Sequence, residues 1–147
     1  MKILAVASGG GHWIELLRLL PAFKGNEVIF ASTKDGFAET VQDFKFYSIP
    51  DINRDEKIKL PVASYNIFRL VRSIRPNVII STGALPGLLA LFAGKVYGAK
   101  TIWVDSIANA EEFSLSGKIA TRFVDRTYTQ WPELATKKQL FHGNVLS

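Results

Sequence analysis

Short apolar segments alternate with longer helical patterns along the 147 residues of the chain. The short segments predict β-strands over residues 3–7, 28–31, 46–49, 78–81, 101–104 and 127–129. The longer patterns predict helices over about residues 12–23, 37–43, 61–75, 85–97 and 116–124. The strands that begin at Ile3, Val28, Val78 and Thr101 are almost continuously apolar, which is typical of strands covered on both faces.

The regular alternation of strand and helix predicts a parallel sheet whose strands are joined by right-handed crossovers. The fold class that we expect is therefore α/β, a Rossmann-like doubly wound parallel sheet. No internal repeat, low-complexity tract or linker divides the chain, so residues 1–147 are expected to form a single domain. In such sheets, ligands bind at the carboxyl ends of the strands, where the strand order reverses.

The loop after the first strand reads Ser8-Gly9-Gly10-Gly11-His12. Three successive glycines let the backbone approach a ligand closely and leave N–H groups free at the start of the next helix. The spacing differs from the G-x-G-x-x-G fingerprint, and no acidic residue ends the second strand to bind a ribose. A tight turn between strand and helix explains the glycines equally well.

His12 follows these glycines directly, at or near the first turn of the predicted helix. A neutral histidine at the mouth of a ligand cleft can take a proton from a hydroxyl group. A lone histidine is more often a surface or capping residue, but this position favours a general base.

Two further loops combine polar residues and glycine at strand ends. Thr82 and Gly83 follow one buried strand, and Asp105 and Ser106 follow the next. The glycine admits close approach of a ligand, and the carboxylate can accept hydrogen bonds from substrate hydroxyl groups or orient a base. A plain strand-to-helix turn is the alternative for the first pair, and the N-cap of a local turn is the alternative for Asp105.

The chain carries a net charge of +5, which favours acidic partners such as nucleotides, nucleic acid or anionic lipid. No acidic residue lies between Lys57 and Val104, so one side of the fold is expected to be positive. Since the chain has no cysteine, disulfides, thiolate metal sites and cysteine nucleophiles are excluded. Its two histidines, His12 and His142, are too far apart in sequence to suggest a multi-histidine metal site.

The predicted helix over residues 61–75 has two faces. The stripe expected to meet the sheet is Ala63, Ile67, Leu70, Val71 and Ile74. The opposite side carries Tyr65, Phe68, Arg69, Arg72 and Arg75. Two aromatic rings among three arginines suit the headgroup region of an anionic membrane, and a solvated face is the alternative. No apolar run reaches the roughly 18 residues that span a bilayer, and the apolar stretch after Lys2 is too short for a signal peptide. We therefore expect a cytoplasmic protein.

Five motifs in this order resemble one family. They are Ser8-Gly9-Gly10-Gly11-His12, Ser81-Thr82-Gly83 with a following Pro-Gly, Trp103-Val104-Asp105-Ser106-Ile107, Ser114-Leu115-Ser116-Gly117-Lys118 and Gln130-Trp131-Pro132-Glu133. Over nearly its whole length, the chain resembles the acceptor-side subunit of the two-part UDP-sugar transferases. The eukaryotic member works in dolichol-linked oligosaccharide assembly, and bacterial counterparts serve capsule and exopolysaccharide synthesis. A more distant resemblance is to the amino-terminal half of the peptidoglycan N-acetylglucosaminyltransferase.

This resemblance implies the amino-terminal half of a GT-B glycosyltransferase, which binds a polyprenyl-diphosphate-linked sugar while a separate subunit binds the UDP-sugar. It implies an inverting transfer, with no cofactor or metal and no nucleic-acid partner, at the inner face of the cell membrane. His12 or a residue of the partner would be the base. The implied substrate-binding residues are Ser8, Gly9, Gly10, Gly11, Thr82, Gly83, Asp105 and Ser106.

This chain has Asp105 where the eukaryotic subunit usually has Glu. It is also expected to lack the amino-terminal membrane anchor of that subunit. Two other functions stay open beside the transferase. One is a non-catalytic membrane scaffold that activates the partner, and the other is an unrelated nucleotide-binding Rossmann module.

Overall fold

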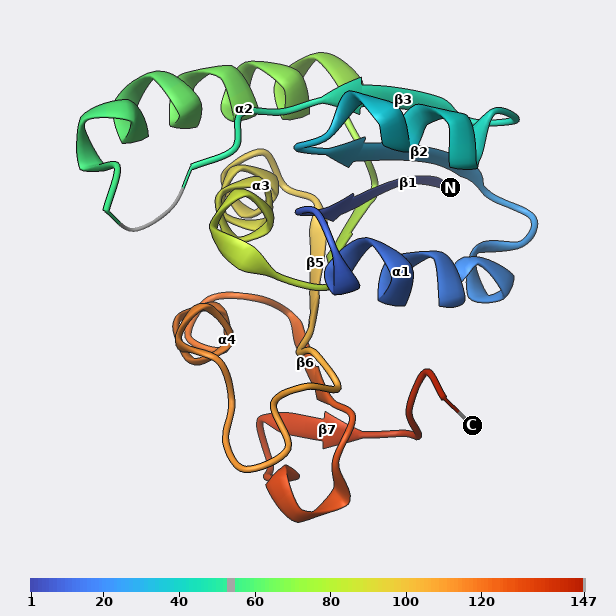
Figure 1. The fold of residues 1–147 in the computed structure, drawn as a ribbon, viewed down its shortest axis with the longest axis vertical. Coiled ribbons are helices and arrows are strands. Elements are labelled where there is room, and N and C mark those ends of the chain that lie inside the picture. Colours follow the sequence, from blue (N-terminus) through green and yellow to red (C-terminus); the bar gives the residue numbers. More distant parts are fainter. Residues whose placement is uncertain (53–54, 147) are drawn as a thin grey trace.

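The computed structural model describes residues 1–52 and 55–146, and within them one seven-stranded sheet carries helices on both faces (Figure 1). The strands are β1 Lys2–Ala7, β2 Glu27–Ser32, β3 Lys45–Ser48, β4 Val78–Ser81, β5 Lys100–Val104, β6 Arg126–Thr129 and β7 Gln139–Phe141. The α-helices are α1 Gly11–Arg18, α2 Leu60–Ile74, α3 Ala84–Val96 and α4 Leu115–Ala120. The 3-10 helices are η1 Leu20–Phe23, η2 Asp35–Val41, η3 Lys57–Lys59 and η4 Pro132–Leu134.

The strands are parallel and lie in the order β3-β2-β1-β4-β5-β6-β7. β1 is therefore an interior strand, with Ala5 opposite Phe30 of β2 on one side and Ile80 of β4 on the other. The order reverses between β1 and β4, so the carboxyl ends of these two strands form the switch point of the sheet. The predicted α/β class and the Rossmann-like doubly wound sheet are confirmed.

The hydrophobic core has two layers, one on each face of the sheet. Successive side chains of a strand point to opposite faces, so Leu4 packs in the layer of α2 and α3, whereas Ala5 packs in the layer of α1. Figure 1 shows α1 on one side of the sheet and α2 and α3 on the other. This double coverage explains why β1, β2 and β4 are apolar almost throughout.

Several predicted boundaries differ from the structure. The helix expected over 12–23 is interrupted, because α1 ends at Arg18 and the 3-10 helix η1 follows with Pro21, which lacks an N–H donor, near its start. The segment expected as a helix over 37–43 is the 3-10 helix η2, and the helix expected over 116–124 ends at Ala120. Strand β7 was not predicted, because its three residues are only partly buried and carry no alternating pattern.

The face of α2 that was predicted to meet the sheet does so, whereas Phe68, predicted on the outer face, is half-buried against α3. Ala63, Ile67, Val71 and Ile74 are buried against the sheet, while Leu70 is partly buried. None of the described helices is both long enough and apolar enough to cross a membrane.

Candidate functional site

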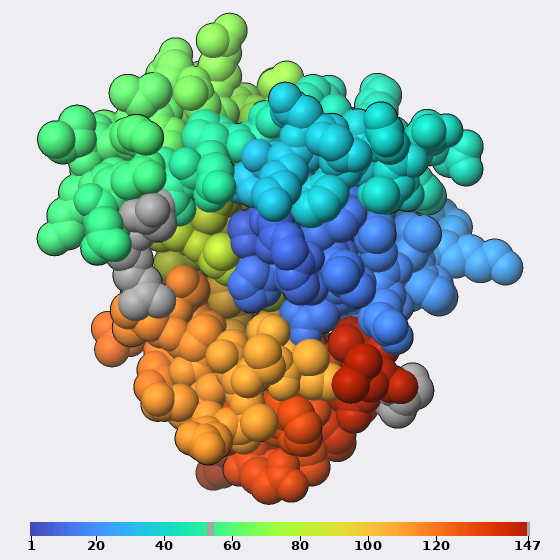
Figure 2. Space-filling view, in the orientation of Figure 1, coloured from blue at the N-terminus to red at the C-terminus, as the bar shows by residue number. Residues whose placement is uncertain are grey.

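A polar pocket of about 470 Å³ opens where β1, β4 and β5 end. Its walls are Gly11, His12, Thr82, Gly83, Ala84, Trp103, Asp105, Ser106, Ala108, Asn109, Ser114 and Ser116. The structure therefore brings together six residues that the sequence singled out: Gly11, His12, Thr82, Gly83, Asp105 and Ser106. Ser8, Gly9 and Gly10 precede them in the first loop and do not line the pocket. In Figure 2, the blue first loop and the orange segment after β5 border a hollow with yellow-green residues behind it.

Thr82 fixes the ring of His12 in the pocket. His12 Nδ1 lies 3.1 Å from the Thr82 carbonyl oxygen, and since a carbonyl only accepts, the ring hydrogen is on Nδ1. The lone pair is then on Nε2, which is the nitrogen able to take a proton. Thr82 Oγ1 donates to the His12 carbonyl oxygen at 2.6 Å, so two hydrogen bonds join the start of α1 to the loop after β4. His12 is the second residue of α1 and does not cap it, because the N-cap is Gly10.

Two α-helices begin at this pocket with no side chain capping their first turn. The N-cap of α1 is Gly10 and that of α3 is Gly83. Uncapped backbone N–H groups and the helix dipole attract an anion to such a position. Ala84, the first residue of α3, has a φ of 67°, a strained value for a residue other than glycine, and such strain occurs preferentially at functional sites.

Lys34 adds a positive charge that the sequence did not single out. A Cβ atom on Gly9 would lie 2.8 Å from Lys34 Cε, so the stem of this lysine lies over the glycine loop. Lys34 comes from the loop after β2, which is the neighbour of β1 in the sheet. The sequence does show a basic residue in a loop that follows a strand. Its position beside the glycines follows only from the strand order, which places β2 next to β1.

The carboxylate of Asp105 is engaged within the chain. It is 2% exposed and accepts hydrogen bonds from Trp103 Nε1 at 2.9 Å, Ser114 Oγ at 2.6 Å, Ser114 N at 2.9 Å and Asn109 Nδ2 at 3.2 Å. Ser114 is in turn the N-cap of α4, where its Oγ accepts from Gly117 N. Asp105 thus folds the segment from 105 to 114 into the wall of the pocket.

Glu15 is a buried acidic residue that the sequence analysis missed. Its Oε1 accepts hydrogen bonds from Ile107 N at 2.7 Å, Gln130 Nε2 at 3.2 Å and Ser106 Oγ at 3.3 Å. It therefore joins α1 to the loops that follow β5 and β6. The available signal was its position three residues after His12, which places both side chains on the same face of a helix.

The outer side of α2 carries the residues predicted to face a membrane. Tyr65 is 65% exposed, and the three arginines, Arg69, Arg72 and Arg75, are exposed and form no ion pair with any described residue. Phe68 is half-buried, because its ring packs against Phe92 and Tyr97 of the α3 region. A shallow hollow of about 500 Å³ is lined by Ser64, Tyr65, Phe68, Arg69, Arg72 and Tyr97.

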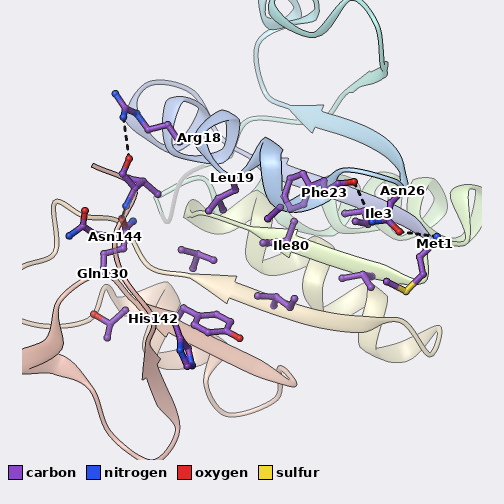
Figure 3. A pocket seen from close by; sticks show the side chains of 18 residues that line it. Met1, Ile3, Arg18, Leu19, Phe23, Asn26, Ile80, Gln130, His142 and Asn144 are labelled. Atoms are coloured by element: carbon purple, nitrogen blue, oxygen red, sulfur yellow. Dashed lines mark hydrogen bonds between the residues drawn. The ribbon is translucent and has the colours of Figure 1, made fainter. Parts of the chain in front are cut away.

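A larger hollow of about 770 Å³ lies on the α1 face of the sheet (Figure 3). Its floor is made of strand side chains: Ile3, Val78, Ile80, Ile102, Val104 and Tyr128. Leu19 and Phe23 form one wall, and residues 142–145 form another, held by a hydrogen bond from Arg18 Nη1 to the Val145 carbonyl oxygen at 3.1 Å. The floor of this hollow is apolar, and the hollow extends along the sheet face as far as the ends of β5 and β6 at Val104 and Thr129.

Among the described residues, no three histidine, aspartate or glutamate side chains are grouped in a way that would hold a metal ion. The groups that the polar pocket does offer are a histidine base, backbone N–H donors and hydroxyl groups. That combination suits proton transfer beside a bound anion.

The fold places the chain in the class of Rossmann-like halves of GT-B proteins. MurG from Acinetobacter baumannii superposes with a TM-score of 0.77 and 13% sequence identity, over 98% of this chain and 46% of that protein. The chain spans slightly less than half the length of this neighbour. Likeness at this identity concerns the fold alone.

The chain belongs to the Alg14 family. The family model described as "Oligosaccharide biosynthesis protein Alg14 like" matches residues 57–145. The UDP-N-acetylglucosamine transferase subunit alg14 of Schizosaccharomyces pombe is 32% identical over 166 residues, covering 92% of this chain and 78% of that protein. The UDP-N-acetylglucosamine–N-acetylmuramyl-(pentapeptide) pyrophosphoryl-undecaprenol N-acetylglucosamine transferase of Syntrophus aciditrophicus is 27% identical over 172 residues, covering 99% and 46%. Both resemblances stated from the sequence, including that to a glycosyltransferase subunit, are confirmed.

Proposed function

We propose that this chain binds a polyprenyl-diphosphate-linked sugar and, with a separate donor-binding subunit, transfers a sugar to it from a UDP-sugar. The observation that carries the proposal is the pocket at the switch point. There, a histidine with a free Nε2 lies beside two uncapped helix N-termini. The names of the relatives, which describe transferase subunits, support the two-chain arrangement.

The residues of the pocket divide between phosphate binding and proton transfer. The N–H groups at the starts of α1 and α3 hold the diphosphate of the acceptor, and Lys34, which lies beside Gly9 outside the pocket lining, adds positive charge nearby. The acceptor hydroxyl gives its proton to His12 Nε2 while its oxygen attacks the anomeric carbon of the donor. The bond from that carbon to the β-phosphate oxygen breaks, and its electron pair leaves with UDP. This direct displacement inverts the anomeric centre.

Asp105 and Thr82 act indirectly in this proposal. Asp105 shapes the wall that presents Ser106 and Asn109, and Thr82 holds the ring of His12. The hydroxyl and amide groups of Ser106 and Asn109 then contact the sugar of the acceptor.

We assign the apolar hollow on the α1 face to the donor-binding subunit. Parallel sheets are normally covered on both faces, yet Val78, Ile102 and Tyr128 of neighbouring strands remain partly exposed there. An apolar segment of the partner subunit would complete this coverage. The hollow is closed by residues 142–145, so the partner would also contact the end of the described chain.

We propose that the outer side of α2 contacts the anionic inner face of the cell membrane, so that the protein is cytoplasmic and peripheral. Exposed arginines around Tyr65 and the hollow beside Phe68 support this placement. The lipid-linked acceptor would reach the pocket from that surface. Capsule or exopolysaccharide synthesis is the proposed setting.

The proposal is tested by measuring sugar transfer in three reactions. One contains the purified chain alone, one contains a donor-binding glycosyltransferase subunit from the same organism alone, and one contains both. Only the pair is expected to transfer sugar from a UDP-sugar to a polyprenyl-diphosphate-linked acceptor. Transfer by this chain alone would overturn the two-chain arrangement, and full transfer by the partner alone would favour the scaffold. Ile102→Glu should abolish pair formation, whereas Ile119→Glu, on the other side of the sheet and 42% exposed, should not.

A further inference from the structure

Glu15 has a carboxylate oxygen that the proposed reaction leaves unexplained. The residue is 5% exposed, and its Oε1 accepts all three of the hydrogen bonds that tie it to neighbouring loops. Its Oε2 is buried and has no hydrogen-bond partner among the described residues. A buried carboxylate oxygen without a partner is costly, so its retention needs a reason.

The unpartnered oxygen lies beside the imidazole of His12. Glu15 Oε2 is 4.0 Å from His12 Nδ1, and the two residues are three positions apart on α1. The Thr82 carbonyl oxygen lies 3.1 Å from the same nitrogen. Two acceptor oxygens therefore lie near Nδ1.

We infer that Glu15 is the positioning residue of the histidine base. Its Oε2 favours the tautomer with hydrogen on Nδ1, which leaves the Nε2 lone pair toward the pocket. When Nε2 takes the proton of the acceptor hydroxyl, the ring becomes an imidazolium, and the buried carboxylate compensates its charge. Glu15 touches no substrate and acts only through His12.

Because this role for Glu15 rests on the proposed transferase function, the kinetic test is made on the reconstituted pair. Glu15→Gln keeps an oxygen for Ile107 N but replaces the charged oxygen with an amide. We expect kcat to fall on the order of 10- to 100-fold, less than the full contribution of a general base, with KM for the acceptor within about twofold. Trp131→Phe, which removes the hydrogen bond from Trp131 Nε1 to the Ile107 carbonyl oxygen in the same junction without removing the charge, should lower the melting temperature and leave kcat within about threefold.

A double-mutant cycle separates positioning from a structural role. In the His12→Ala background, Glu15→Gln should change kcat by less than about twofold, because its effect passes through the missing ring. Equal fold losses in both backgrounds would overturn the inference. If Glu15→Gln does not fold, the same cycle is run with Glu15→Asp. Its side chain is shorter by one methylene group, so the carboxylate lies farther from the His12 ring.

An NMR measurement on the isolated chain separates this inference from the proposed function. The chain has only two histidines, so imidazole ¹⁵N signals can be assigned with a His142→Asn variant. Wild type should show hydrogen on Nδ1 of His12. Glu15→Gln should show a mixture of tautomers, because the amide NH₂ that replaces Oε2 can donate to Nδ1 in competition with the acceptor oxygen of Thr82. Failure of the wild-type pair to transfer sugar would overturn the proposed function. An unchanged tautomer in Glu15→Gln would overturn the role of Glu15, whatever the result of the transfer assay.

Discussion

The ring of His12 packs against a backbone position that only glycine can occupy. A Cβ atom on Gly83 would overlap the imidazole of His12, and one on Gly87 would overlap the hydroxyl of Ser81. Gly83 therefore allows close packing of its loop against His12, and Gly87 allows close packing of α3 against the end of β4. At the residue scale, the geometry of the pocket depends on these glycines, which have no side chain, as much as on the polar side chains that line it.

His12→Ala should lower the turnover of the reconstituted pair by about 10²–10⁴-fold, because a positioned general base contributes that much. His12→Asn should be about as slow, since its amide can donate to the Thr82 carbonyl oxygen but cannot take a proton. Steady-state kcat, with binding of partner and acceptor measured separately, checks both variants. Turnover of the Asn variant within about twofold of wild type would remove His12 from the role of base.

At the element scale, side-chain ties hold the helices to the sheet. Asp125, which precedes β6, accepts hydrogen bonds from Lys95 of α3 at 2.9 Å and from Thr101 N and Oγ1 of β5 at 2.9 and 3.0 Å. The hydrogen bond from Lys95 is the main cause that lowers the pKa of Asp125 to about 2, and partial burial acts in the opposite direction. One carboxylate thus joins three elements on the side of the sheet that carries α3.

Asp125→Asn should reduce the free energy of unfolding at neutral pH by about 1 kcal/mol, a value reduced for screening because the side chain is 27% exposed. The pKa of the carboxyl is lowered in the folded state, so its contribution is complete above the ordinary value of 3.8 and is lost as pH falls through about 2. Urea unfolding at pH 7 and near pH 2 measures this difference.

Glu112 offers a matched comparison, because it pairs with Lys118 at 2.7 Å on the exposed surface. Its replacement by Gln should change stability little. An Asp125→Asn variant as stable as wild type at pH 7 would show that the interactions of the Asp125 carboxylate with Lys95 and Thr101 do not contribute to stability.

The outer side of α2 also acts as an element. Replacing Arg69, Arg72 and Arg75 by Gln should weaken binding to anionic vesicles and reduce its salt sensitivity, since each basic residue near such a surface contributes on the order of 1 kcal/mol. The control variant, with Lys24, Lys45 and Lys138 replaced by Gln, removes the same charge from exposed positions elsewhere. Vesicle flotation compares the two, and equal weakening would indicate an effect of net charge alone.

At the scale of the whole molecule, the sequence predicted what depends on local pattern. Apolar strands, the two faces of α2 and the loops at strand ends all follow from short-range periodicity, and they locate the pocket correctly at the end of β1. Glu15 and Lys34 were missed for one physical reason. Their significance comes from contacts made across the fold, such as that between Glu15 and Gln130, which are 115 positions apart. No local pattern contains that information.

The position of β1 between β2 and β4 determines when the pocket can form during synthesis on the ribosome. β1 can pair with β2 early, but its other edge stays open until β4 has emerged, because residues such as Ile3 and Val78 pair across the chain. The walls of the pocket then require residues up to Ser116, and the tie to Glu15 requires Gln130. These are long loops to close, so they close late. A nascent chain that ends after α3 therefore already contains His12 and the glycines, but it does not yet contain the residues that complete the polar pocket.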